Sequence, residues 1–252
     1  MVKFTVGDYL LMPRFFIEKS DITDSGVVLR DMAHIKALRL RVGDEITVCD
    51  GDGMDFFVRL IDIANGEAHA ELLRFAPSET EASVRLAVFL AFAKGDRAEY
   101  AIQKCTELGA SEFFLFPSER VVANPDAKSL AKKLVRLNAV AKSAAEQSGR
   151  GRIPTVAACN SFKSAVTAAA GYDLPLLFYE NEQQTSLTAS ITDRNPTTIS
   201  IMTGAEGGFS PREAAYATDN GMKSLTLGKR ILRCDTAPIA ATAAVMLLTG
   251  NL

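Results

Sequence analysis

Residues 198–248 read TISIMTGAEGGFSPREAAYATDNGMKSLTLGKRILRCDTAPIAATAAVMLL, and this stretch decides the fold. It opens with a β-branched apolar run that predicts a buried strand, and the strand leads into a glycine-rich loop at residues 204–209. Ser210, Pro211 and Glu213 then form a helix start, with an N-cap, a proline in the first turn and a capping-box glutamate. A second short strand, a second glycine-bearing turn and a last apolar helix follow. Two successive strand–loop–helix junctions are where an α/β fold places its ligand.

The first glycine-rich loop carries no phosphate-binding fingerprint. Neither G-x-G-x-x-G nor G-x-x-x-x-G-K-[ST] occurs there, and the carboxylate of Glu206 would repel a phosphate at close range. Glycine backbone beside a carboxylate suits a ligand with hydroxyls, an adenine edge or a cation, and S-adenosylmethionine has all three. A tight structural turn is the alternative interpretation of the same residues.

Both loops resemble the signature loops of a known family. TGAEGGFS at residues 203–210 and LGKRILRCDTA at residues 227–237 are similar to those of the SPOUT-class, or knotted, methyltransferases that methylate N3 of a uridine in 16S ribosomal RNA. The family usually has proline at Ala205 and Thr-Glu at Cys234-Asp235, so this chain departs from the pattern there. The resemblance implies an S-adenosylmethionine-dependent rRNA (uracil-N3) methyltransferase of ribosome biogenesis. It also implies a trefoil knot in the C-terminal α/β domain, and a homodimer that acts on 16S rRNA within the small ribosomal subunit.

The resemblance also suggests roles for individual residues. Arg233 is the catalytic candidate, because an arginine aimed at a uracil carbonyl would stabilise negative charge there. A salt bridge from Arg233 to Asp235 or Glu206 that holds the loop shut is the structural alternative. No metal is expected, because the sulfonium already activates the methyl group. The residues expected to bind S-adenosylmethionine are Glu180, Thr203, Gly204, Glu206, Gly207, Gly208, Leu227, Gly228, Ile231 and Leu232.

The amino-acid composition is typical of a soluble globular protein. The 252 residues are 48% hydrophobic and 23% charged, and the longest apolar runs are too short to cross a bilayer. Four scattered cysteines without a C-x-x-C pair, and only two histidines, suggest neither a disulfide framework nor a metal site. We therefore expect a cytoplasmic protein with no membrane partner.

Positive charge gathers in one segment although the net charge is −2. Residues 120–152 hold eight basic and two acidic side chains, which gives +6 and leaves −8 for the rest of the chain. Such a cluster favours RNA, although a basic helix is also a common solvated surface. The turn after the long helix is expected to be flexible and to present two of the arginines. The residues expected to contact RNA are Arg14, Lys104, Arg120, Lys142, Arg150 and Arg152.

Two domains are predicted. Residues 1–75 carry short strand patterns and an Asn-Gly hairpin signal, which favour a small barrel, and the resemblance makes this a PUA-like RNA-binding β-barrel domain. A polar, proline-bearing stretch marks the boundary, and residues 76–252 form the SPOUT methyltransferase domain. There, residues 84–92 predict a strand buried on both faces, and residues 129–147 a long helix with an apolar stripe toward the core. His34 is expected to be structural.

Two other functions fit the same sequence. One is a SPOUT enzyme with another RNA target, such as a ribose 2′-hydroxyl. The other is an RNA-binding ribosome assembly factor that has lost catalysis and would bind RNA without cofactor. The glycines at 207, 208 and 228 argue against that loss, because they keep both loops open to a ligand.

Overall fold

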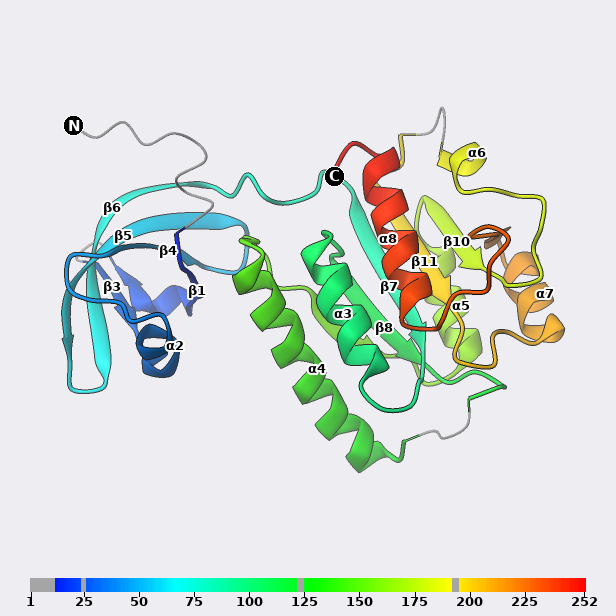
Figure 1. Ribbon diagram of the computed structural model, residues 1–252, viewed down its shortest axis with the longest axis horizontal. Coiled ribbons are helices and arrows are strands. Elements are labelled where there is room, and N and C mark those ends of the chain that lie inside the picture. The colour runs from blue at the N-terminus through cyan, green and yellow to red at the C-terminus, as the bar shows by residue number, and fades with distance from the viewer. Residues whose placement is uncertain (1–11, 24–25, 122–124, 192–194) are drawn as a thin grey trace. The chain divides into compact units, whose positions relative to one another are not determined.

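The computed structural model describes residues 12–23, 26–121, 125–191 and 195–252 (Figure 1). By its contacts the chain divides into two compact units, Met1–Glu81 with Ala145–Ile153, and Ala82–Ala144 with Pro154–Leu252. The boundary predicted after residue 75 therefore misses two segments, because residues 76–81 and 145–153 both pack with the first unit. Across the described ranges, no helix has the length and apolar character that a membrane span needs.

The first unit is built on a six-stranded mixed sheet in the order β1-β4-β5-β6-β3-β2. Strand β1 pairs parallel with β4, and the other neighbours are antiparallel. The strands are β1 (Arg14–Phe16), β2 (Ile22–Thr23), β3 (Gly26–Leu29), β4 (Glu45–Cys49), β5 (Met54–Ala64) and β6 (Glu67–Pro77), with a 3-10 turn η1 (Lys19–Asp21) and helix α2 (Met32–Ala37). The sheet curls into a half-barrel with β1 and β2 as its edges, where the sequence suggested a barrel.

Local signals explain much of this half-barrel. Asn65 and Gly66 both have positive φ, +54° and +86°, which makes the tight turn that the Asn-Gly pair predicted between β5 and β6. Inside the curled sheet, Phe15 is fully buried with the apolar residues of β3, β4 and β5. The ring of His34 packs on Phe15 with 4.5 Å between centroids, in keeping with the structural role expected for it.

Two arginines expected to contact RNA are instead buried inside the first unit, so this part of the prediction is wrong. Arg14 is 9% exposed and donates to both carboxylate oxygens of Asp55, at 2.7 and 2.9 Å. Arg150 is 3% exposed and donates to Glu81 at 2.7 Å. The same Glu81 carboxylate accepts the backbone amides of Gly151 and Arg152, so the turn after the long helix is held in place rather than free.

The second unit is built on a six-stranded parallel sheet in the order β12-β10-β11-β7-β8-β9. Its strands are β7 (Arg85–Ala91), β8 (Glu112–Phe116), β9 (Thr155–Ala158), β10 (Leu174–Phe178), β11 (Thr198–Thr203) and β12 (Lys223–Leu225). Its helices are α3 (Arg97–Glu107), α4 (Ala127–Gln147), α5 (Phe162–Ala170), α6 (Thr188–Ile191), α7 (Pro211–Asp219) and α8 (Thr236–Leu248). The last three residues of α4 belong to the first unit.

Helices cover both faces of this sheet. Alternate residues of β7 divide between two cores: Leu86 and Val88 pack with α3, α4 and α8, while Ala87 and Phe89 pack with α5 and α7. Residues 86–92 are all at most 5% exposed, which confirms the predicted double-sided burial. Helix α4 turns its apolar stripe to the first of these cores, as predicted. The layered sheet leaves the carboxyl ends of its strands free to carry loops, and the two sequence motifs follow β11 and β12.

Candidate cofactor pocket

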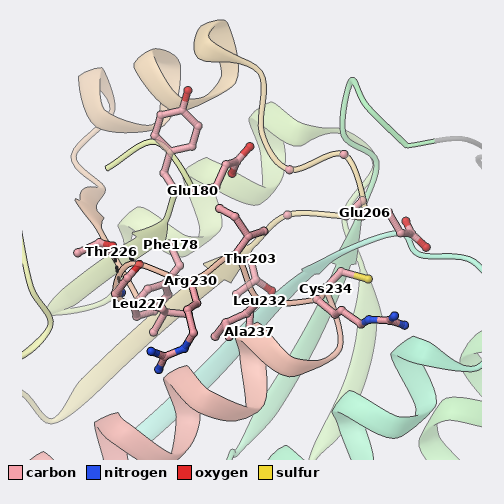
Figure 2. A pocket seen from close by; sticks show the side chains of 18 of the residues that line it. Phe178, Glu180, Thr203, Glu206, Thr226, Leu227, Arg230, Leu232, Cys234 and Ala237 are labelled. Atoms are coloured by element: carbon pink, nitrogen blue, oxygen red, sulfur yellow. Dashed lines mark hydrogen bonds between the residues drawn. The ribbon is translucent and has the colours of Figure 1, made fainter. Parts of the chain in front are cut away.

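The loops after β10, β11 and β12 enclose a cavity of about 590 Å³. Strands β11 and β12 both pair with β10, so their carboxyl ends meet at one edge, the usual ligand position in an open α/β sheet. All ten residues expected to bind the cofactor line this cavity, and so does Arg233. Figure 2 shows Glu180 in the loop after β10, and Thr203 and Glu206 at the end of β11 and in the loop that follows it. The full lining comprises Arg97, residues 178–180, 203–208, 226–228 and 230–234, and Ala237.

The first loop can fold this tightly only with glycine. A Cβ added at Gly204 would lie 3.0 Å from the carbonyl carbon of Gly208. Gly208 itself has φ +62°, and a Cβ there would stand 1.9 Å from Oε1 of Glu180. The chain leaves the loop through a complete capping box, in which Ser210 and Glu213 each bond the other's amide. The backbone of the loop is therefore brought close to the carboxylate of Glu180.

Glu206 is held as a carboxylate at one side of the cavity. It accepts the amide of Lys94 at 3.0 Å and pairs with the guanidinium of Arg97 at the start of α3. Burial opposes its charge, but hydrogen bonds from its own amide and that of Lys94, together with Arg97, outweigh this effect and lower the pKa of Glu206. The partner of Glu206 is thus Arg97 and not Arg233, which removes one of the two structural alternatives for Arg233.

Glu180 supplies a second carboxylate directly after β10. Its Oε2 lies 3.4 Å from the amide of Phe209, and its side chain is 28% exposed. The hydroxyl of Thr203, another lining residue, is buried and has no hydrogen-bond partner among the described residues. A buried hydroxyl without a partner is destabilising unless a ligand satisfies it. Two carboxylates disfavour a phosphate and suit a ligand with hydroxyls and a positive charge.

The second loop, which follows β12, begins with a hydrogen-bonded turn and then becomes exposed to solvent. The hydroxyl of Thr226 accepts the amide of Gly228 at 3.1 Å, and Gly228 has φ +101°. Beyond it, Ile231 is 79% exposed while Leu232 turns into the cavity (Figure 2). The carbonyl of Arg233 accepts the amides of Thr236 and Ala237, which starts α8.

Arg233, the predicted catalytic residue, is exposed and lines the cavity, as does Arg230. The described residues provide no ion pair for Arg233, with Asp235 or with any other carboxylate. Arg97, by contrast, is committed to Glu206. Arg97 could not be predicted from the sequence, because its partner lies 109 residues away and no local pattern marks it.

The remaining residues expected to contact RNA vary in exposure. Lys104 is paired with Glu107 at 2.7 Å, and Lys142 is half-buried on α4. Arg152 is exposed in the first unit, next to the buried Arg150. Arg120 lies in the second unit and donates to the carbonyl of Gly207 at 2.9 Å.

Within the ranges that the structure describes, no cluster of His, Cys, Asp or Glu could hold a metal ion.

Comparison with known proteins decides the family. A family model described as an RNA methyltransferase domain matches residues 80–246, and one described as an RNA methyltransferase PUA domain matches residues 31–73. Ribosomal RNA small subunit methyltransferase E of Bacillus subtilis (strain 168) is 31% identical over 245 residues, which cover 93% of this chain and 96% of the relative. This chain belongs to the ribosomal RNA small subunit methyltransferase E family.

Other members agree with this assignment. The protein of the same name from Synechocystis sp. is 36% identical over 212 residues, covering 83% of this chain and 68% of the relative. A crystal structure of the Neisseria gonorrhoeae enzyme bound to S-adenosyl methionine matches with a TM-score of 0.84 and 32% identity, over 94% of this chain and 98% of that one. The predicted SPOUT fold with a PUA-like N-terminal domain is confirmed.

Proposed function

We propose that this protein transfers the methyl group of S-adenosylmethionine to N3 of a uridine in 16S rRNA of the small ribosomal subunit. The observation that carries the proposal is the cavity, where both signature loops and Glu180 meet. Membership of the small subunit methyltransferase E family supports the RNA substrate. The Neisseria gonorrhoeae relative, which was crystallised with S-adenosyl methionine, supports the cofactor.

The residues of the cavity fit this cofactor. Glu180 and Glu206 offer acceptors for hydroxyls and negative charge near a sulfonium, and Thr203 offers a buried hydroxyl that needs a partner. Phe178 and Leu232 line the cavity with apolar side chains against which an adenine ring could pack. When bound, the cofactor supplies a methyl group already activated by its positive sulfur.

The chain must supply placement and charge. Holding the attacking nitrogen in line with the methyl group contributes roughly 7–11 kcal/mol in well-oriented reactions. N3 of uracil must lose its proton, to solvent or to a base, in order to attack the methyl group. Negative charge develops on the uracil as that proton leaves, and the exposed guanidinium of Arg233 at the cavity can stabilise it. The target base must be unstacked from its neighbours to enter the active site, which requires that the flanking RNA be bound as well. We assign the binding of this flanking RNA to the PUA-like unit.

A homodimer in the cytoplasm is part of the proposal. Leu247 and Leu252 are 63% and 65% exposed, and exposed apolar side chains of this size are candidates for a protein interface. All four cysteines are free thiols, in keeping with a reducing compartment. Light scattering at several concentrations tests the dimer, and a monomer at all of them would contradict it.

The test is transfer of a labelled methyl group to small ribosomal subunits that lack this modification, with the modified nucleotide mapped by mass spectrometry. The proposal expects one labelled uridine, methylated on the base at N3. A methyl group on a ribose hydroxyl would favour a SPOUT enzyme with another target. RNA binding without any cofactor binding would identify an inactive assembly factor instead.

A further inference from the structure

The loop after β8 is hydrogen-bonded to the residues that follow the glycine-rich loop of the pocket. At its centre is Glu213, a carboxylate only 6% exposed. Besides capping α7, it accepts the amide of Glu119 at 2.8 Å and the hydroxyl of Ser118 at 3.2 Å. The hydroxyl of Ser210 in turn donates to Glu119 at 2.7 Å. Because one buried carboxylate bonds both segments, residues 118–120 and the end of the glycine-rich loop are fixed together.

Arg120 extends from this support to the pocket. Its Nη1 donates to the carbonyl of Gly207 at 2.9 Å and lies 3.8 Å from Oε1 of Glu180. A Cβ added at Gly207 would lie 2.9 Å from the Cβ of Arg120, so the stem of the arginine packs on the loop backbone. Glycine is therefore needed at 207 for contact with Arg120. Both groups that it touches, Gly207 and Glu180, line the cavity, whereas Arg120 does not.

We propose that Arg120 is a positioning residue for the methyl donor: it fixes the glycine-rich loop and the Glu180 carboxylate in the arrangement that binds the cofactor. This rests on the proposed function. Arg120 was predicted to contact an RNA phosphate, but its hydrogen bond and its charge are directed at the pocket wall. Arginine suits the position because its planar fork can donate to a carbonyl while its charge faces a carboxylate.

The test uses the full chain and two variants, Arg120→Gln and Arg120→Lys. Arg136→Gln is the matched control, because Arg136 pairs with Glu99 at 2.7 Å away from the cavity lining. Calorimetry without RNA measures the Kd for S-adenosylmethionine. We expect Arg120→Gln to raise that Kd by about tenfold or more, the loss expected for a charge-assisted hydrogen bond. Arg120→Lys keeps the charge and should lose less, and the control should match the wild type.

RNA binding separates this role from a phosphate contact. For an rRNA fragment around the target, positioning predicts an unchanged salt slope of log K in Arg120→Gln. A slope reduced by about 1 with unchanged cofactor affinity would show a phosphate contact and overturn the assignment. Wild-type protein that binds no S-adenosylmethionine would instead overturn the proposed function.

A third variant, Gly207→Ala, covers the case in which Arg120→Gln does not fold. In Gly207→Ala the added methyl would lie 2.9 Å from the Cβ of Arg120 and 3.3 Å from its carbonyl oxygen, so the stem of Arg120 or the loop backbone must shift. It should raise the Kd for S-adenosylmethionine while the circular dichroism spectrum stays native. A folded Gly207→Ala protein with wild-type cofactor affinity would count against the role of this contact.

Discussion

Gly208→Ala is the substitution whose effect follows most directly from the geometry of the pocket. Gly208 has φ +62°, in the left-handed region, where an L-residue costs about 1–2 kcal/mol. The new Cβ would stand 1.9 Å from Oε1 and 2.4 Å from Cδ of Glu180. The carboxylate must therefore move by about 1.5 Å to reach ordinary contact, which breaks its approach to the amide of Phe209.

Two separate losses are expected. The free energy of unfolding should fall by about 1–2 kcal/mol from the backbone alone. The affinity for S-adenosylmethionine should fall by at least about tenfold, because a carboxylate hydrogen bond to a ligand contributes about 1.5–3 kcal/mol. Urea unfolding gives the first quantity and calorimetric titration the second.

Gly221→Ala provides the control for backbone strain. Gly221 has φ +95° at the end of α7, and nothing lies within 4 Å of an added Cβ. It should therefore lose similar stability and keep its cofactor affinity. The reasoning is refuted if Gly208→Ala and Gly221→Ala bind S-adenosylmethionine equally well.

Two further predictions concern the first unit and the pH response. Arg152→Ala should weaken RNA binding and reduce the salt dependence of the binding constant. Arg150→Ala should leave that salt dependence unchanged and destabilise the first unit by roughly 3–5 kcal/mol, because Glu81 loses its buried partner. An equal salt dependence in both variants would contradict this. The lowered pKa of Glu206 means that its contribution to stability is present above the unfolded pKa and is lost as pH falls through the folded one. Urea unfolding from pH 7 to 3 should show a weaker pH dependence in Glu206→Gln, and parallel curves would argue against it.

Local signals were enough for most elements of the second unit. The strand predicted over residues 84–92 is β7 (Arg85–Ala91), and the helix predicted over residues 129–147 is α4 (Ala127–Gln147). The capping box at Ser210 forms as read from the sequence. Such features depend on neighbours within a few residues, so a single sequence contains them.

Long-range partners were the part that the sequence could not supply. Arg150 follows a glycine in a polar turn, which resembles an exposed site, yet Glu81 buries it from 69 residues away. Pairing of β1 with β4 is likewise non-local, so Arg14 looked like a surface charge. In the pocket, the loop residues were predicted, but the ion pair between Arg97 and Glu206 was not. No sequence periodicity or motif indicates an ion pair between residues so far apart in the chain.

A crystal grown with S-adenosylmethionine tests the central claim most directly. The account predicts the cofactor in the cavity between the loops after β10, β11 and β12, with Glu180, Thr203 or Glu206 in hydrogen-bond contact. Crystals in which these loops contact no cofactor at saturating concentration, or in which a nucleotide's phosphates bind there instead, would contradict it.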